Sequence, residues 1–399
     1  MSGSLFSRCG LAVAVAILCF SSLTWGGNAA PKYKVLEPIS HGNLTIFPVV
    51  TASTHDTSGF ITLDEGIHSG EIIVTEAGHV GGLVRGPHPH TPVSAGAQVN
   101  QLVLINNSKH PLILLAGEIV TGGKQDRVVA KDRIVPPESD PVDLGVFCVE
   151  PGRWTGISDK FSSMHGQMAQ PSVRSKAMVA KDQQQVWNSV GTANAAVTLM
   201  ADSAVSSTYA PSAGLTAYPA QSSYAKTFES ENVRKIIADE AAPVEQSYSS
   251  LMKQLRDQHA VGVVVAVGGR LIWIDIFASS SLLEKYWPKL VRSYAAEAIT
   301  THAAAKSVNL ADARQFLEKT EGSREMSESE PGVYRQSETI APNFKLFTLF
   351  SLLPGTDFDL HISKIADESE IAEMGKIYPQ SRPAWSEAGG TMYYPMPAR

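Results

Sequence analysis

Short apolar and β-branched runs, separated by turn residues, fill the first part of the chain. They recur at 44–50, 59–63, 71–75, 99–105, 112–120, 127–135 and 142–149. Turn signals such as Asn106 with Asn107 and Pro136 with Pro137 lie between them. Frequent short strands with such turns are typical of a β-sandwich or barrel. We therefore expect residues 33–155 to be all-β.

The pattern changes after Trp154, where helical periodicity becomes the main signal. It is found at 172–190, 229–259, 281–299 and 309–319. We expect Ser172 to cap the first of these helices. Proline disrupts a helix interior, so we expect Pro243 to break the second helix into two and Pro288 to kink or restart the third.

Two strand-like runs, 261–267 and 271–277, flank Gly268 and Gly269 and predict a β-hairpin, because glycine permits the positive φ of a tight turn. Runs at 344–353 and 358–362 predict closing strands. The expected fold class is α+β. It combines a strand-rich N-terminal half, sandwich- or barrel-like, with helices and a further β-hairpin in the C-terminal half.

Composition divides the chain into three parts: a signal peptide over 1–30, one α+β domain over 31–365 and a C-terminal tail over 366–399. Within the domain, 156–260 is expected to hold helices and 261–365 a hairpin, helices and strands. The stretch 191–226 is rich in Ala, Ser, Thr, Tyr and Pro with little charge, which predicts a flexible segment.

The N-terminus has the order of a signal peptide: Arg8, an apolar run of about ten residues over 11–20, then small residues such as Ala29 and Ala30. The apolar run is too short to cross a bilayer core of roughly 30 Å as a helix. We expect cleavage between residues 24 and 31 and a periplasmic or extracellular product with no stable membrane span. An uncleaved anchor is the alternative.

Charge and cysteine content narrow the classes of function. A net charge of −6 argues against general nucleic-acid binding, which requires a basic surface. Cleavage would leave Cys148 as the only cysteine, so no internal disulfide is expected. Cys148 lies in an apolar run and is expected to be a buried, inert packing residue; a nucleophile is the alternative.

The segment from Gly117 to Arg127 carries the most chemical information. An apolar run leads into Glu118, and alternation puts this residue on the same face as its apolar neighbours. A buried carboxylate without a partner is strongly unfavourable. We therefore expect Glu118 to pair with Lys124 or Arg127 across the turn at Gly122 and Gly123.

The same counting places Arg127, Lys131 and Arg133 on one strand face, with Asp126 and Asp132 on the other. Three cations on one face are suited to holding an anion. The alternative is an internal salt-bridge network that closes a hairpin.

A second charged segment ends the β-rich part with Glu150, Arg153 and Trp154. Together the two segments resemble the ARG and rhodanese-phosphatase-superfamily-associated protein domain family. The residues that carry the resemblance include Gly117, Glu118, Gly123 to Arg127, Pro136, Cys148 to Glu150 and Gly152 to Trp154. The similarity continues through Gln185 to Trp187 and the hairpin and helix at 261–299, and so covers most of residues 35–360.

The resemblance implies a charged site on an α+β domain but no established reaction. The family name records an association with ADP-ribosylglycohydrolases and phosphatase-like proteins. It therefore implies a ligand related to ADP-ribose or a phosphate ester. Export would remove this chain from cytoplasmic nucleotides, which argues against a nucleotide ligand.

Other motifs are weaker. Three histidines lie close together in the sequence, at His79, His88 and His90, and imidazole suits zinc or copper. No cysteine lies near them in the sequence, and Glu76 is the only adjacent carboxylate. We therefore predict no metal site and no cofactor. Gly122, Gly123 and Lys124 lack the spacing of a nucleotide-binding phosphate loop.

The preferred function is an exported ligand-binding or interaction domain for a small anionic ligand, with protein partners unspecified. The alternatives are a hydrolase with Glu118 or Glu150 as general base and a structural envelope protein. The candidate ligand-binding residues are Glu118, Lys124, Gln125, Asp126, Arg127, Glu150, Arg153 and Trp154.

Overall fold

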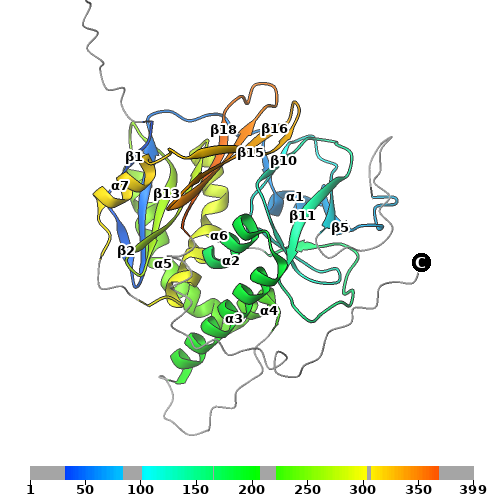
Figure 1. Ribbon diagram of the computed structural model, residues 1–399, viewed down its shortest axis with the longest axis horizontal. Coiled ribbons are helices and arrows are strands. Elements are labelled where there is room, and N and C mark those ends of the chain that lie inside the picture. Colours follow the sequence, from blue (N-terminus) through cyan, green and yellow to red (C-terminus); the bar gives the residue numbers. More distant parts are fainter. Residues whose placement is uncertain (1–31, 84–100, 165, 207–221, 303–306, 368–399) are drawn as a thin grey trace, which may run out of the picture. The chain divides into compact units, whose positions relative to one another are not determined.

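The strands form one large antiparallel sheet and a smaller barrel-like region (Figure 1). The structure, a computed structural model, describes residues 32–83, 101–164, 166–206, 222–302 and 307–367. The expected signal peptide, His88, His90 and nearly all of the expected tail lie outside these residues, as does 207–221 of the segment expected to be flexible.

The large sheet joins strands from both ends of the chain. Its order is β1-β3-β13-β14-β18-β17-β16-β15, with β2 also paired to β3. The bounds are β1 Lys34–Val35, β2 Ile39–His41, β3 Leu44–Thr51, β13 His259–Val267, β14 Arg270–Phe277, β15 Ser323–Glu330, β16 Tyr334–Ala341, β17 Phe344–Ser351 and β18 Asp359–Ala366. Because β3 pairs with β13 along its length, residues 34–51 are part of the sheet built by the C-terminal half.

The predicted hairpin is confirmed as β13 and β14, with Gly268 at φ +56° and Gly269 at φ +80° in the turn. The strand predicted over 358–362 is extended as β18, and that over 344–353 corresponds to β17. The sequence analysis missed β15 and β16 because β15 in particular is mostly polar and shows no apolar alternation.

The small β region is built from residues 61–163. Its strands are β4 Ile61–Thr62, β5 Ile72–Glu76, β6 Gln101–Asn106, β7 Leu112–Leu114, β8 Ile119–Thr121, β9 Arg127–Val129, β10 Arg133–Val135, β11 Val142–Cys148 and β12 Ser162–Ser163. They form a three-stranded sheet, β10-β7-β4, and a six-stranded sheet, β12-β8-β9-β11-β6-β5. A bridge between Thr75 of β5 and Lys160, beside β12, brings the two edges of the six-stranded sheet together. The six-stranded sheet is therefore nearly closed around its own apolar core.

Among the described residues, helices pack on both faces of the large sheet and on the small β region. They are α1 Leu63–Ser69, α2 Pro171–Ser175 with a π-helical turn at Lys176–Ala180, α3 Gln183–Ser206, α4 Tyr224–Glu229, α5 Glu231–Gln254, α6 Ser280–Ile299 and α7 Leu310–Glu318. In the described part of the chain, α3, α5 and α6 share the main core with one face of the sheet, and α7 packs on the other face. No helix among these residues is both long and apolar enough to cross a membrane.

Several helix predictions were wrong in detail. Gln170, with Pro171 following it, stands at the N-cap that was expected at Ser172. The segment 191–206 is helical as the second half of α3. Pro243 lies inside the continuous helix α5, so the predicted break is wrong, and α6 continues through Pro288 without a restart. Both α5 and α6 pack in the main core, and tertiary packing overrides local propensity.

The apolar run 112–120 is two strands, β7 and β8, separated by a turn. Gly117 has φ +92°, and a Cβ atom there would lie 2.7 Å from Cδ of Arg174. The Glu118 carboxylate accepts a hydrogen bond from the Leu115 N–H at 2.8 Å and closes this turn. The run 127–135 divides in the same way into β9 and β10, which belong to different sheets. The expected fold class, α+β with a barrel-like N-terminal half, is confirmed.

Candidate functional site

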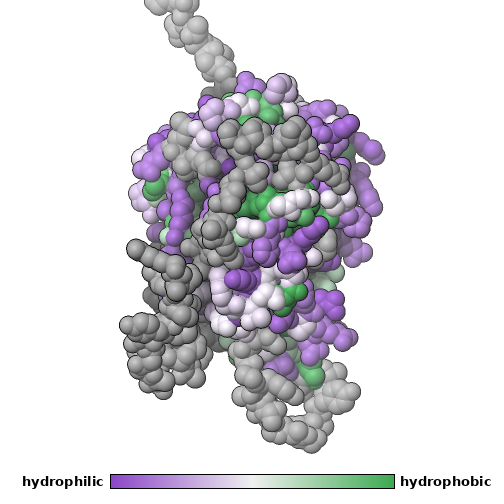
Figure 2. Space-filling model, turned by 90° about the vertical axis from the view of Figure 1, so that its right-hand side faces the viewer, coloured by the Kyte–Doolittle hydropathy of each residue, from purple (hydrophilic) through white to green (hydrophobic). Residues whose placement is uncertain are grey.

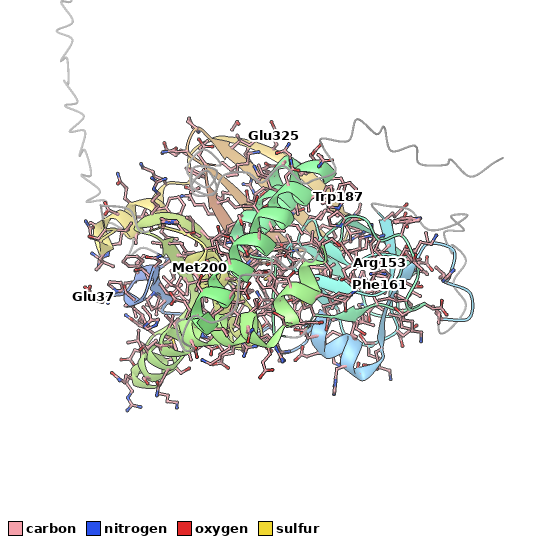
Figure 3. The ribbon with its side chains drawn as sticks, turned by 90° about the horizontal axis from the view of Figure 1, so that it is seen from below. Glu37, Arg153, Phe161, Trp187, Met200 and Glu325 are labelled. Carbon is pink, nitrogen blue, oxygen red and sulfur yellow. The ribbon has the colours of Figure 1, made fainter. Side chains whose placement is uncertain are left out.

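The turn at Gly122 and Gly123 contacts the segment that ends the β-rich part of the chain. Arg153 makes this contact and is labelled in Figure 3, beside the small β region. Its Nη1 donates to the Gly123 carbonyl at 3.0 Å, and its Nε donates to Glu150 Oε2 at 2.6 Å. Its Nη2 lies 3.4 Å from Asp126 Oδ1. These contacts bring the two charged segments together.

Asp126 is the centre of this contact. Its Oδ1 accepts from the Gly122 N–H at 3.0 Å, and its Oδ2 accepts from Ser223 Oγ at 3.1 Å. Ser223 caps α4 and was not among the sequence candidates, because it lies 97 residues after Asp126 in the chain. Burial raises the pKa of the Asp126 carboxyl, with the nearby Glu150 acting in the same direction.

Glu76, at the end of β5, is a second site residue that the sequence analysis missed. Its Oε1 accepts from the Lys124 N–H at 2.9 Å and lies 3.9 Å from Arg127 Nη2. Glu76 is 3% exposed. Its signal in the sequence was weak: a carboxylate at the end of a buried strand, 48 residues before Lys124.

Arg127 is fully buried in the cluster. Its Nη1 donates to the Gln125 carbonyl at 2.6 Å. Nε and Nη2 of Arg127, Oε2 of Glu76 and Oε1 of Gln125 are buried and have no hydrogen-bond partner among the described residues. Burial lowers the pKa of the Arg127 guanidinium.

Trp154 forms the solvent side of the cluster, with 41% of its surface exposed. Its ring centroid lies 5.2 Å from Lys124 Nζ and 5.7 Å from Arg127 Cζ. Figure 2 looks onto the side of the protein that carries the small β region, where mainly hydrophilic residues surround a few apolar areas. A partly exposed indole beside two cations is suited to stacking on a ring.

Glycine is required at Gly123, which has φ +47°. A Cβ atom there would lie 2.3 Å from Phe161 Cζ and 2.7 Å from Glu76 Oε1. Phe161 and Arg153 are labelled close together in Figure 3. The turn therefore lets the backbone approach Glu76 closely enough for the Lys124 N–H to reach its carboxylate.

Glu118 is bound elsewhere, and its expected pairing with Lys124 or Arg127 is wrong. Its Oε1 forms a short contact with Lys289 Nζ of α6, and Lys289 also contacts Asp64 Oδ2 at 3.0 Å. The prediction failed because α6 follows about 160 residues later, and local counting considers only nearby cations. Burial raises the pKa of the Glu118 carboxyl.

The predicted face of Arg127, Lys131 and Arg133 does not exist, because β9 ends at Val129. Arg133 begins β10 and contacts Glu330 Oε2 at 3.4 Å. Asp132, between the strands, points into the interior and accepts from the Ala116 N–H at 2.8 Å.

A second buried charge network connects Asp132 to the large sheet. His361 Nδ1 lies 2.6 Å from Asp132 Oδ2, and His361 Nε2 lies 3.2 Å from Asp275 Oδ1. Arg174 of α2 pairs with both oxygens of Asp275, at 2.9 and 3.1 Å, and the Tyr294 hydroxyl also donates to Asp275. The two carboxylates overcome the effect of burial and raise the pKa of His361 to about 9.

Cys148 is buried, as expected, and its strand pairs with β9 so that Cys148 lies opposite Arg127. Burial raises the pKa of its thiol to about 11, although Arg127 acts in the opposite direction. A thiol with this pKa is protonated at neutral pH, which opposes the nucleophile alternative.

Within the described ranges, no group of three histidine, cysteine or acidic side chains is arranged to hold a metal ion. Of the three histidines considered, His79 is described, and its Nδ1 lies 3.7 Å from the exposed Asp159. This pair alone does not make a coordination site.

Comparison with known proteins identifies one family. No curated protein and no solved structure matches the chain. Residues 32–362 match the ARG and Rhodanese-Phosphatase-superfamily-associated Protein domain, a range that contains the small β region, the charge cluster and all but the end of the large sheet. The chain therefore belongs to the ARG and Rhodanese-Phosphatase-superfamily-associated Protein domain family.

Proposed function

We propose that this protein is an exported binding domain for a small anionic ligand, held by Arg127 at the cluster beneath Trp154. The observation that carries the proposal concerns Arg127: its guanidinium is fully buried, and two of its nitrogens, Nε and Nη2, have no hydrogen-bond acceptor among the described residues. Buried polar groups are almost always hydrogen-bonded. An unmet pair of donors on a cation is suited to an anion.

The donor geometry favours a phosphate or carboxylate. Guanidinium presents N–H groups in a planar fork that matches two oxygens of such a group. Lys124, partly exposed beside Trp154, adds a second positive charge at the solvent side. The association recorded in the family name supports a phosphate ester or an ADP-ribose-like molecule as the anion.

Access to Arg127 requires the indole of Trp154 to move or to stack on the ligand, because the guanidinium itself is not exposed. No hydrogen bond among the described contacts holds the Trp154 ring against Arg127. A rotation of this ring would lose its packing and its cation–ring contacts, which contribute about 0.5–1 kcal/mol at an exposed site and about 2 kcal/mol or more for a desolvated cation such as Arg127. The remaining cluster, in which Arg153 links Glu150 to Asp126, would act as a rigid support.

The test is Arg127→Lys, which keeps the charge and removes the fork. Purified mature protein is titrated with inorganic phosphate, ethyl phosphate and ADP-ribose by calorimetry, and melting temperatures are measured in parallel. We expect wild type to bind at least one of these anions and Arg127→Lys to bind at least tenfold more weakly with a similar melting temperature. Arg314→Lys, at an exposed position on α7, is the matched control.

The other functions give different results in the same experiment. A structural salt-bridge core predicts that Arg127→Lys lowers the melting temperature and that wild type binds none of the anions. A hydrolase predicts turnover of an ester. The geometry favours it less, because Glu118 is paired with Lys289 and Glu150 is held by Arg153, so neither carboxylate is an unengaged general base.

Export is part of the proposal and has its own test. Mass spectrometry of the protein from its native host should find an N-terminus between residues 24 and 31. A mature species that retains Met1 would refute export by cleavage.

A further inference from the structure

We infer that the ligand carries hydroxyl groups next to its anionic group, so that its class is a phosphorylated sugar rather than inorganic phosphate or a simple phosphate ester. This inference rests on the proposed function, and it concerns the acceptors of the cluster rather than its donors. Oε2 of Glu76 and Oε1 of Gln125 are buried without a hydrogen-bond partner among the described residues.

Glu76 carries the argument because a carboxylate has only acceptor oxygens. Its Oε1 is satisfied by the Lys124 N–H at 2.9 Å, and its Oε2 is not satisfied. A fully ionised phosphate offers no proton to this oxygen and would repel it. The group that satisfies Glu76 must therefore be a donor on a part of the ligand that is not itself the anion.

The unmet donors and the unmet acceptor lie on neighbouring side chains. Oε1 of Glu76 lies 3.9 Å from Nη2 of Arg127. A hydroxyl both donates and accepts, and it can donate to Glu76 while it accepts from Arg127. A sugar phosphate has such a hydroxyl a few bonds from its phosphate.

Trp154 fits the same class of ligand. Its partly exposed ring lies beside Arg127 and Lys124, and the apolar C–H face of a sugar ring can pack on an indole. An acidic ligand without a ring or hydroxyls would leave both the indole face and Glu76 unused.

The experiment compares ribose 5-phosphate with ethyl phosphate, which has the same charged group and no hydroxyls, and with ribose. We expect ribose 5-phosphate to bind wild type at least tenfold more tightly than ethyl phosphate, because a hydrogen bond to a charged group contributes about 1.5–3 kcal/mol and 1.4 kcal/mol is tenfold. Glu76→Gln keeps the shape and an acceptor for Lys124 but places amide hydrogens or a weaker acceptor toward the ligand. It should abolish this preference and leave ethyl phosphate binding within about threefold of wild type.

Exposed Glu318→Gln on α7 is the matched control and should keep the preference. If Glu76→Gln does not fold, Gln125→Leu with the exposed Gln185→Leu as its control tests the same acceptor requirement. Equal binding of ethyl phosphate and ribose 5-phosphate, both dependent on Arg127, would overturn the inference and leave the proposed function standing. No binding of any phosphate would overturn both.

Discussion

Replacing His361 by glutamine should remove a defined pH dependence of stability. His361 lies on β18, fully buried between Asp132 of the β9–β10 loop and Asp275 of β14. The imidazolium therefore joins the small β region to the large sheet. Glutamine retains a side-chain donor but carries no charge at any pH.

The magnitude follows from the change in pKa. The two carboxylates raise the pKa of His361 from 6.5 to about 9, and one pKa unit corresponds to about 1.4 kcal/mol. Protonated His361 thus contributes on the order of 3 kcal/mol to the free energy of unfolding. Because the folded-state pKa is the higher one, this contribution is complete below pH 6.5 and is lost as the pH rises from 6.5 to 9.

Lys364 acts in the opposite sense over an overlapping range, since burial lowers its pKa to about 7. Its unfolded form binds protons more tightly, so its effect increases stability as the pH rises above 7. The quantity to compare is therefore the difference in free energy of unfolding between wild type and variant at each pH. The Lys364 effect is the same in both proteins and cancels in this difference.

The assay is urea unfolding at pH 6, 7.5 and 9.5 for wild type, His361→Gln and Asp132→Asn, with the exposed His68→Gln as control. The wild type minus His361→Gln difference should shrink by about 3 kcal/mol between pH 6 and 9.5, while His68→Gln follows wild type. Asp132→Asn keeps the shape of the site. The difference in free energy of unfolding between wild type and this variant should shrink by less than about 3 kcal/mol over the same pH range. A constant difference across this pH range would show that His361 is not held protonated and would refute the reasoning.

Three further predictions concern the other buried groups. Lys289→Met should destabilise the fold by about 3–5 kcal/mol in urea unfolding, because it leaves Glu118 buried without its cation; an effect under 1 kcal/mol would contradict this pairing. Gly123→Ala should lower the melting temperature clearly, since its Cβ atom would meet Phe161 at a positive φ, and an unchanged melting temperature would argue against the turn geometry. Cys148 should react slowly with iodoacetamide at pH 7.5 in the folded protein and rapidly in denaturant, because its thiol is buried and protonated; rapid labelling of the folded form would contradict this.

The candidate site lies where several distant segments of the chain meet. Arg127 comes from β9, Glu76 from β5, Arg153 and Trp154 from the loop after β11, and Ser223 from the start of α4. The nearly closed small sheet brings the first four together, and α4 adds the fifth from outside it. The second network, around Asp275 and His361, joins the small β region to the large sheet.

The sequence by itself determined the features that depend on near neighbours. The hairpin of β13 and β14 was predictable because a two-glycine turn and two β-branched runs act over less than 20 residues. The α+β class followed from the same local periodicities.

Only the tertiary structure decided which charges pair and where apolar runs turn. Glu118 binds Lys289 of α6, and Asp132 binds His361 of β18, because burial makes any nearby opposite charge valuable regardless of its distance along the chain. Alternation failed twice: the apolar run 112–120 turns at Gly117, next to Arg174, and β9 ends at Val129, before Lys131 and Arg133. Closure of the six-stranded sheet placed the Glu76 carboxylate beside Arg127. No local pattern in the sequence predicts this closure.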